Sequence, residues 1–323
     1  MEGEFVITTT QPGYFTTIQD EGRWGYQAYG MPISGAMDRY AYRVANLLVG
    51  NQINAAVLEM TGIGATLKFD EQQLVAVCGA EMQGLLNGKS ITNWSAFTVP
   101  KRGEIKFDVA INGYRTYLAI HGGFDVPLVL DSRSTCPWAK VGGYEGRILR
   151  QGDVLYVGQD SEFITHPRKL DPLYLPQYGN AINLRVILGL QDSMFTQETI
   201  QTFFENIYVV TNQSDRTGYH LEGPRIKHID NPDIISDAAC LGAIQIPAHG
   251  MPFIMTADHQ TTRGFAKLGS VIQVDLSKLA QGKTGDSIRF ILVTEEEAIT
   301  ALCIERQSYI RITKLCQDSD DAY

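Results

Sequence analysis

The fold class is decided by two neighbouring stretches, Leu74-Val75-Ala76-Val77-Cys78 and Leu85-Leu86-Asn87-Gly88-Lys89-Ser90-Ile91. The first is an apolar run typical of a strand. In the second, Asn-Gly lies between two short apolar runs. This dipeptide favours a two-residue hairpin turn, because both turn positions need a positive φ. The two stretches together predict antiparallel β-structure.

Further short strands separated by turns are predicted along the rest of the chain. The predicted strands are residues 97–99, 105–109, 117–120, 184–188, 207–210, 242–246 and 253–255. Spacing of this kind is typical of antiparallel sheets or barrels and not of repeated βαβ units. The expected fold class is therefore mainly β, with a few short helices.

The helices are predicted from their caps. One helix is expected over residues 38–49, with Asp38 as its N-cap. Thr196 is placed to cap a second helix, over residues 197–205. Thr294, with a glutamate three residues further on, forms a capping box that begins a third helix.

The length of the chain predicts two domains. At roughly 150 residues per domain, 323 residues correspond to about two. Gly152-Asp153 and Gly285-Asp286 each precede an apolar strand, and each could close one β-domain. Residues 163–180 are rich in proline, tyrosine and polar residues, as a linker would be. We therefore predict an N-terminal domain of residues 1–175 and a C-terminal domain of residues 176–323.

Charge and composition exclude several classes of function. The chain has 27 Lys+Arg against 36 Asp+Glu, a net charge of -9, so it lacks the basic surface that nucleic-acid binding requires. No stretch approaches the roughly 18 uninterrupted apolar residues of a spanning helix. Met1-Glu2-Gly3-Glu4 does not begin a secretion signal, and the five cysteines are widely spaced. We expect a cytoplasmic protein that binds neither nucleic acid nor a membrane.

The sequence predicts neither a metal site nor a phosphate-binding loop. The six histidines show no HxH, HxxxH or HExxH spacing. Gly282-Lys283-Thr284 has the end of a phosphate-binding loop, but Ser277 stands where the first glycine of that loop is needed. Gly62-Ile63-Gly64 has no third glycine and no following helix, so it is not a dinucleotide fingerprint.

A first group of candidate site residues directly follows the predicted strand at 117–120. Gly122 and Gly123 could turn their backbone N–H groups toward the carbonyl oxygen of a ligand. His121 or Asp125 could then move a proton at the same place. The alternative interpretation is a tight turn with a structural histidine.

A second candidate is the cluster of small donors around Arg133. Ser134 and Thr135 follow this arginine directly, and their hydroxyls could complete a polar pocket. The guanidinium of Arg133 suits a carboxylate or a polarised carbonyl. A structural loop network is the alternative.

The second half of the chain repeats this pattern of small, acidic and arginine residues. Ser214 and Arg216 are candidate substrate-binding residues, and Asp258 is a candidate catalytic acid just after the strand at 253–255. The hydroxyls of Thr261 and Thr262 follow shortly after Asp258. Each motif is weak by itself, because Asp–Arg pairs are commonly structural salt bridges.

Taken in order, the motifs resemble the allophanate hydrolase subunit 2 family. This family includes the KipI antagonist, the C subunit of 5-oxoprolinase and the matching part of the carboxyltransferase domain of urea amidolyase. The matching stretches are Thr17 to Arg23, Ser34 to Asp38, His121 to Pro127, Ser132 to Thr135, Ser214 to Arg216, Gly242 to Gln245 and Ala257 to Thr262. They extend over about residues 8–293, in family order.

The resemblance implies a fold, a reaction and partners. The fold is a cyclophilin-like β-barrel architecture in two subdomains of a carboxyltransferase-like unit. The reaction is the ATP-dependent opening of 5-oxo-L-proline, a cyclic amide, to L-glutamate. The implied partners are a KipI-like chain (allophanate hydrolase subunit 1) and, for 5-oxoprolinase, a third subunit of the LamB/YcsF type. Because no phosphate loop is visible, ATP is expected at a partner or at a shared site.

Two alternatives follow from the same resemblance. A urea carboxylase-type subunit would transfer carboxyl from carboxybiotin to urea, so biotin is a further implied cofactor. A KipI antagonist would bind a KipI-like chain without turnover. The sequence also departs from the family pattern, with Arg263 and Asp131 at positions where glycine is usual. These departures affect the shape of the pocket, and therefore the substrate, more than the fold.

Overall fold

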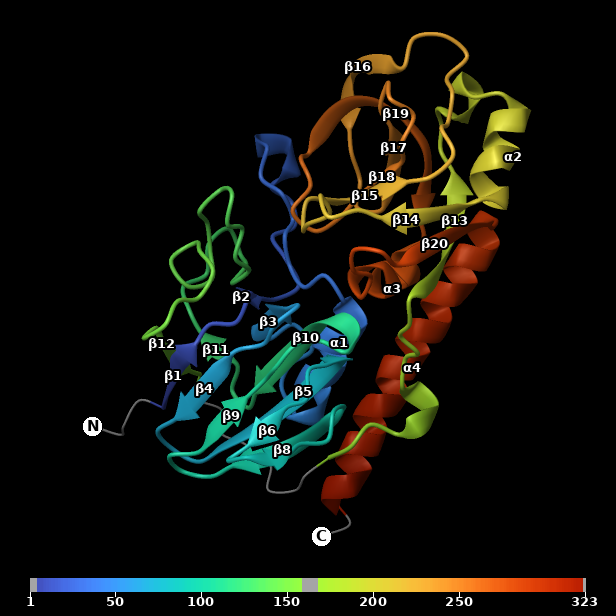
Figure 1. Cartoon of the computed structure of the whole chain (residues 1–323). Coiled ribbons are helices and arrows are strands. Elements are labelled where there is room, and N and C mark those ends of the chain that lie inside the picture. The colour runs from blue at the N-terminus through green and yellow to red at the C-terminus, as the bar shows by residue number, and fades with distance from the viewer. Residues whose placement is uncertain (1–4, 159–167, 322–323) are drawn as a thin grey trace. The chain divides into compact units, whose positions relative to one another are not determined.

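The computed structural model describes residues 5–158 and 168–321. The chain forms two compact units (Figure 1). Unit 1 consists of Met1–Arg23, Ser34–Tyr178 and Arg306–Tyr323, and unit 2 of Trp24–Ile33 and Gly179–Glu305. A single boundary near residue 175 therefore does not describe the two units completely. Trp24–Ile33 precedes it but belongs to unit 2, and Arg306–Tyr323 follows it but belongs to unit 1. Part of the predicted linker, residues 163–167, lies outside the described residues.

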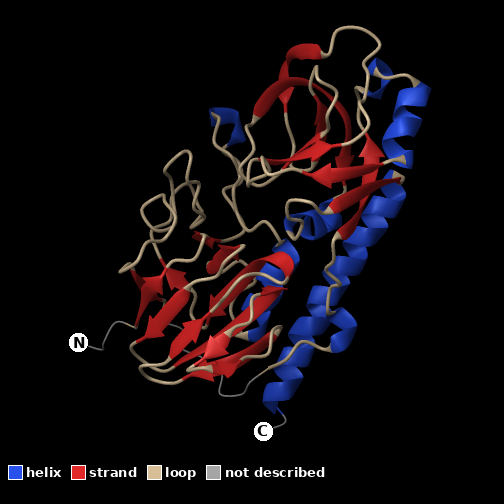
Figure 2. Ribbon diagram, viewed as in Figure 1, coloured by secondary structure: helices blue, strands red, loops and turns tan. Residues whose placement is uncertain are grey.

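Unit 1 contains two β-sheets, which Figure 2 distinguishes from the helices by colour. In order, the seven-stranded sheet comprises β11 (Phe124–Asp125), β12 (Val154–Val157), β1 (Val6–Gln11), β4 (Thr66–Phe69), β9 (Glu104–Lys106), β6 (Leu85–Leu86) and β7 (Lys89–Ser90). The five-stranded sheet comprises β2 (Phe15–Gln19), β3 (Val57–Thr61), β10 (Asn112–Ile120), β5 (Gln73–Glu81) and β8 (Ser95–Val99). All the pairings within the two sheets are antiparallel.

Strand β5 is apolar from Leu74 to Ala80 because both of its faces are buried there. Val75 and Val77 belong to one hydrophobic cluster, and Ala76 and Cys78 belong to another. Successive side chains of a strand alternate between the two faces of its sheet, so a strand covered on both faces has no polar face. Helix α1 (Arg39–Leu48) contributes to the second cluster, and the first joins the two sheets.

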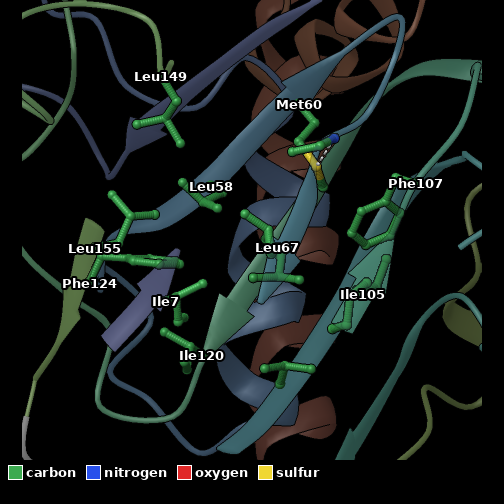
Figure 3. Packing of buried hydrophobic residues seen from close by; sticks show 14 of the residues in the cluster. Ile7, Leu58, Met60, Leu67, Ile105, Phe107, Ile120, Phe124, Leu149 and Leu155 are labelled. Carbon is green, nitrogen blue, oxygen red and sulfur yellow. Dashed lines mark hydrogen bonds between the residues drawn. The ribbon is translucent and has the colours of Figure 1, made fainter. Parts of the chain in front are cut away.

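Figure 3 shows the cluster that joins the sheets of unit 1. Ile7 and Leu67 come from the seven-stranded sheet, and Leu58 and Ile120 come from the five-stranded sheet. All four side chains are fully buried. Burying such a side chain contributes about 1.5–3 kcal/mol. The cluster therefore holds the two sheets together.

The predicted Asn-Gly hairpin is confirmed. Asn87 and Gly88 connect β6 to β7 with φ values of 49° and 80°. The strands are paired through Leu85–Ser90 and Leu86–Lys89. Two positive φ values are those of a type I′ turn, a common two-residue hairpin turn that Asn-Gly favours, and this is why the dipeptide predicts it.

Unit 2 is a closed barrel. Its ring runs through β13 (Ala181–Leu188), β20 (Ser287–Leu292), β14 (Ile207–Val210), β15 (Gly218–Glu222), β18 (Phe253–Met255), β17 (Ala243–Ile246) and β19 (Thr262–Val271), with β16 (Asp233–Ala238) added beside β19. A pairing of β13 with β19 closes the ring. One pair, β13 with β20, is parallel, a pairing that the expectation of antiparallel sheets or barrels did not include. The prediction of a mainly β fold is confirmed.

Three helices begin at the predicted caps. Asp38 accepts a hydrogen bond from the N–H of Ala41 at the start of α1, and Thr196 accepts one from Thr199 at the start of α2 (Gln197–Glu205). In the capping box of α4 (Glu295–Asp321), the Thr294 N–H donates to Glu297. Short helical segments not predicted from the sequence are α3 (Leu276–Ala280), η1 (Gln27–Tyr29), η2 (Pro172–Tyr174), η3 (Asp192–Met194) and η4 (Gln273–Asp275).

Helix α4 explains why one boundary does not describe the units. Its residues from Arg306 onward group with unit 1, where Tyr309, Ile312 and Cys316 are buried in the cluster that contains α1. Among the described residues, no helix combines the length and apolarity needed to cross a membrane.

Asp275 should make the stability of the protein depend on pH. Arg185 donates two side-chain hydrogen bonds to its buried carboxylate, and Lys278 lies 2.8 Å away. Burial alone would raise the pKa of Asp275, but the bonds from Arg185 and Lys278 outweigh it and lower this pKa. A lowered carboxyl pKa contributes stability above the unfolded-state pKa of about 3.9, and this stability is lost as pH falls through the folded-state pKa.

We expect Asp275→Asn to remove this contribution. Its free energy of unfolding at pH 7 should fall by about 1–3 kcal/mol, and the difference from wild type should shrink as the pH is lowered below 4. Urea unfolding at a series of pH values measures both quantities. The matched control is Glu71→Gln, an exposed carboxylate beside Lys101. A difference between Asp275→Asn and wild type that stays constant down to low pH would contradict the expectation.

Candidate functional site

The predicted site residues divide between the two units. His121, Asp125 and Arg133 belong to unit 1, together with Gly122, Gly123, Ser134 and Thr135. Asp258 and Arg216 belong to unit 2, together with Ser214, Thr261 and Thr262.

The centre of the unit 1 group is Asp20, directly after β2. Its Oδ1 accepts hydrogen bonds from the Ser132 hydroxyl at 2.7 Å and the Gly22 N–H at 2.8 Å, and also from the Ser134 hydroxyl. Its Oδ2 accepts from the backbone N–H of Arg133 at 2.5 Å. Asp20 is 8% exposed, so these donors replace water as its partners. The motif around Asp20 and the motif around Arg133 therefore form one hydrogen-bonded cluster.

The hydroxyls predicted to bind substrate are engaged in this cluster. Besides donating to Asp20, Ser134 Oγ accepts from the Asp20 N–H at 3.0 Å. Thr135 Oγ1 donates to the carbonyl oxygen of Ile18 at 2.9 Å. Both residues are completely buried. The prediction that Ser134 and Thr135 contact substrate does not fit this geometry, and the structural alternative does.

The turn at His121 also uses its donors inside the fold. The Gly122 N–H donates to Asn51 Oδ1, and the Gly123 N–H donates to the carbonyl oxygen of Ile120, both at 2.9 Å. Neither group is therefore available to the carbonyl of a ligand. The interpretation of Gly122 and Gly123 as carbonyl donors must be corrected, because the turn from β10 to β11 satisfies both N–H groups itself.

Three predicted residues of unit 1 keep hydrogen-bonding groups that the described part of the fold does not use. The Arg133 Nε donates to the carbonyl oxygen of Val126 at 2.9 Å, and its terminal nitrogens make no hydrogen bond within residues 5–158 and 168–321. His121 Nδ1 lies 2.8 Å from the carbonyl oxygen of Val49, so Nδ1 is the donor of this hydrogen bond. Nε2 itself is buried without a partner among the described residues. The Asp125 side chain is exposed on β11.

In unit 2, Arg216 and Asp258 form a buried ion pair. The Nε–Oδ2 distance is 2.8 Å and the Nη2–Oδ1 distance is 3.1 Å. The residues are 5% and 2% exposed. Each neutralises the other, so Arg216 is not free for a substrate carboxylate. The prediction of Asp258 as a catalytic acid does not fit this pairing either.

The remaining predicted residues of unit 2 differ in their availability. Ser214 Oγ accepts from the His220 N–H at 3.0 Å and donates to the carbonyl oxygen of the same residue, so it closes a turn. Thr262 is exposed at the start of β19, and Thr261 before it is half-buried. Within the described residues the hydroxyls of both threonines have no hydrogen-bond partner. These two residues remain candidates for contact with a ligand.

Sequence reasoning did not select Asp20, Asn51 or the buried polar network at Glu59. The Asp20-Glu21-Gly22 turn, in which the aspartate accepts from the N–H two residues on, is a local pattern that could have indicated Asp20. Glu59 lies fully buried in β3 and accepts from the Tyr117 hydroxyl at 2.8 Å. Burial raises the pKa of Tyr117 well above its ordinary value, and Glu59 and Asp38 add to this, so the phenol stays a donor. No local pattern around Glu59 indicates that network.

Within the described part of the chain, no three His, Cys, Asp or Glu side chains are arranged to hold a metal ion. The Gly282-Lys283-Thr284 segment forms a turn after α3. There the Tyr219 hydroxyl donates to the Gly282 carbonyl oxygen at 3.0 Å, and the Lys283 N–H donates to Asp286. This segment therefore does not form a phosphate cradle.

The β-architecture and the motifs together define a carboxyltransferase-type domain. The chain belongs to the family described as carboxyltransferase domain, subdomain A and B, which matches residues 29–292.

Individual relatives are similar over nearly the whole chain. The 5-oxoprolinase C subunit of Escherichia coli (strain K12) is 33% identical over 298 residues, which are 92% of this chain and 94% of that protein. The urea amidolyase of Saccharomyces cerevisiae is 34% identical over 90% of this chain, but the match covers 17% of that protein. The crystal structure of the K. lactis urea amidolyase matches with a TM-score of 0.92 and 30% identity, over 97% of this chain and 20% of that one.

Proposed function

We propose that this chain is a subunit of an ATP-dependent 5-oxoprolinase, which opens 5-oxo-L-proline to L-glutamate. The observation that carries the proposal is the match with the C subunit of 5-oxoprolinase, which includes 92% of this chain and 94% of that protein. The two chains therefore correspond over nearly all of their lengths. The urea amidolyase match covers a minor part of a much longer protein.

The chemistry requires several groups. A cyclic amide reacts slowly, so it needs a donor at its carbonyl oxygen, a base near its N–H, and activation by phosphate or a carboxylated cofactor. Because Gly122 and Gly123 use their N–H groups internally, the donor that we assign to the carbonyl is the guanidinium of Arg133. We assign the proton transfer at the amide N–H to His121 or to the exposed Asp125.

Activation is assigned to the rest of the complex. Because the Gly282-Lys283-Thr284 turn does not form a phosphate cradle, we propose that ATP binds to a partner or at a shared site. The proposed partners are a KipI-like chain and a LamB/YcsF-like chain. Asp258 occupies the guanidinium of Arg216, which was predicted to bind substrate, so this residue gives no support for a bound carboxybiotin.

A second candidate function is carboxyl transfer to urea. It is favoured by the TM-score of 0.92 with the urea amidolyase of K. lactis over 97% of this chain. The two candidates differ in substrate, because 5-oxo-L-proline is a cyclic amide with a carboxylate and urea has none.

The test is reconstitution. The chain is co-expressed with a KipI-like and a LamB/YcsF-like subunit, and the complex is assayed for ATP-dependent loss of 5-oxo-L-proline and formation of L-glutamate. Parallel assays supply urea, bicarbonate and a biotin carboxylase. Turnover of 5-oxo-L-proline supports the proposal, and turnover of urea alone supports the second candidate. A well-folded complex that turns over neither, beside tight binding to the KipI-like chain, would indicate a regulator and contradict the proposal.

Arg133→Ala should lower kcat of the reconstituted complex by about 10²–10³-fold, the usual effect of removing one donor to a developing oxyanion. The backbone N–H of residue 133 still donates to Asp20, so the cluster is expected to persist. Steady-state kinetics measure the change, and the melting temperature verifies the fold. Arg150→Ala, at an exposed arginine of the same unit, is the matched control. Equal kcat values for the two variants would exclude Arg133 from this role.

A further inference from the structure

Arg263 is a partly buried cation that lacks a carboxylate partner. It lies on β19, and among the described residues it forms no ion pair. Burial lowers its pKa, with no compensating charge beside it. Asp237, its cross-strand partner on β16, is paired instead with Lys267 at 2.6 Å. An unpaired guanidinium in such surroundings is costly unless a ligand supplies the anion.

The guanidinium of Arg263 is held in place by rings and one hydrogen bond. Its Cζ lies 4.7 Å from the ring centroid of Phe253 and 5.7 Å from that of Phe265. Its Nε donates to Gln260 Oε1 at 3.2 Å. The two terminal nitrogens have no hydrogen-bond partner in the described part of the chain. Neither belongs to its buried unpaired polar atoms, so both are accessible to solvent. A planar fork fixed in this way is suited to the two oxygens of a carboxylate.

Two histidines lie close to Arg263. The ring of His220 contacts the same Phe253, with the two ring centroids 4.5 Å apart. His259 is 1% exposed; its Nδ1 bonds the carbonyl oxygen of Gln260, and its Nε2 is buried without a partner among the described residues. Burial lowers the pKa of both histidines, and Arg263 lowers both further. Both imidazoles therefore favour the neutral form, chiefly because they are buried, and Arg263 adds to this effect.

The acidic groups nearby raise the pKa of the two histidines, opposing Arg263, but each has hydrogen-bond partners of its own. Asp258 is engaged by Arg216. Asp215, which favours protonation of His220, is exposed, and its Oδ1 accepts from the N–H groups of Thr217 and Gly218. His249 is exposed and acts on His220 in the same direction as Arg263. Arg263 is thus a fixed cation close to two histidines with lowered pKa values, and it directly follows Thr261 and Thr262 in the chain.

We propose that Arg263, stacked on Phe253 and preceded by Thr261 and Thr262, binds the carboxylate of a small-molecule ligand on unit 2. The site requires a planar anion that can accept two parallel hydrogen bonds from the guanidinium. The choice of 5-oxo-L-proline as that ligand rests on the proposed function. The inference that Arg263 binds a carboxylate does not depend on it.

The proposal is tested by binding, without turnover. Histidine ring resonances of the full chain are followed by NMR during titration with 5-oxo-L-proline and, separately, with 2-pyrrolidinone, which is the same cyclic amide without the carboxylate. In wild type, 5-oxo-L-proline should shift the His220 and His259 resonances and raise the pKa of both histidines, because a nearby anion favours imidazolium. 2-Pyrrolidinone should bind at least about tenfold more weakly, since it lacks the charge-assisted hydrogen bonds.

Variants locate the site. Arg263→Gln should weaken binding of 5-oxo-L-proline by about tenfold or more, and Arg263→Lys should restore it only in part, because lysine keeps the charge without the planar fork. Arg225→Gln removes the same charge from an exposed arginine of unit 2 and should bind as wild type does. Equal binding by Arg263→Gln and wild type, or no histidine response to 5-oxo-L-proline in wild type, would overturn the proposal.

Binding and turnover can fail separately. A reconstituted complex that does not consume 5-oxo-L-proline, while the carboxylate still binds through Arg263, contradicts the proposed function and leaves this inference standing. A complex that consumes 5-oxo-L-proline, while Arg263→Gln binds it as wild type does, contradicts the inference and leaves the proposed function standing.

Discussion

Asp258→Asn is expected to lower the free energy of unfolding by about 3–5 kcal/mol, because it removes the carboxylate that pairs with a buried guanidinium. Arg216 is 5% exposed and donates two side-chain hydrogen bonds to the carboxylate of Asp258. Water cannot replace these bonds at a site with so little exposure. Urea unfolding of the full chain measures the loss.

Two further variants separate this explanation from a general effect of mutation. Arg216→Met combined with Asp258→Leu removes both charges, so the double variant should be more stable than Asp258→Asn. Glu71→Gln removes one partner of the exposed Lys101–Glu71 pair and should change the free energy of unfolding by about 0–1 kcal/mol. The free-energy loss of the double variant should be smaller than the summed losses of Arg216→Met and Asp258→Leu. A larger loss would contradict the idea that the uncompensated charge destabilises the protein.

Asp20→Ala is expected to have a comparable effect in unit 1, about 3–5 kcal/mol, because four donors lose one acceptor group at once. Ser132, Ser134 and the N–H groups of Gly22 and Arg133 all donate to this carboxylate. The two serines are fully buried, so their hydroxyls would be left without a replacement from solvent. Urea unfolding measures the loss of stability.

Hydrogen exchange shows whether the effect is local. The amide protons of Gly22 and Arg133 should exchange faster in Asp20→Ala than in wild type, beyond the change that reduced global stability causes. Asp125→Ala, at an exposed aspartate of the same unit, is the matched control and should stay within about 0.5 kcal/mol of wild type. Stability of Asp20→Ala equal to that of Asp125→Ala would show that the cluster does not depend on Asp20.

Much of the fold could be predicted because its signals are local. The strands at 207–210 and 253–255 and the three capped helices have the predicted positions. The prediction failed where pairing joins distant segments. The parallel pairing of β13 with β20 brings together residues about 100 positions apart. The predicted strand at 105–109 ends at Lys106, since pairing with β4 stops there. Such pairings depend on register between strands, which no short window of sequence contains.

The candidate site was predicted less well than the fold. Sequence motifs identified polar residues at loops, but not whether their hydrogen-bonding groups are free. Asn51, 71 positions from Gly122, takes up the N–H group that was predicted to bind a ligand. Arg263 was noted only as a departure from the family pattern, and its lack of a carboxylate partner among the described residues became visible once Asp237 was seen to pair with Lys267.

The sequence by itself determined the elements: the apolar run of β5, the Asn-Gly hairpin, the helix caps and the order of the family motifs. These depend on the preferences of neighbouring residues, which are local. The tertiary structure alone decided which polar groups are used internally and which remain available. Asp258 was predicted as a site residue and Asp20 was not, yet both have structural roles in the fold, because partners from distant segments occupy their carboxylates. The terminal nitrogens of Arg133 and Arg263 stay available because the fold supplies them with no such partner among its described residues.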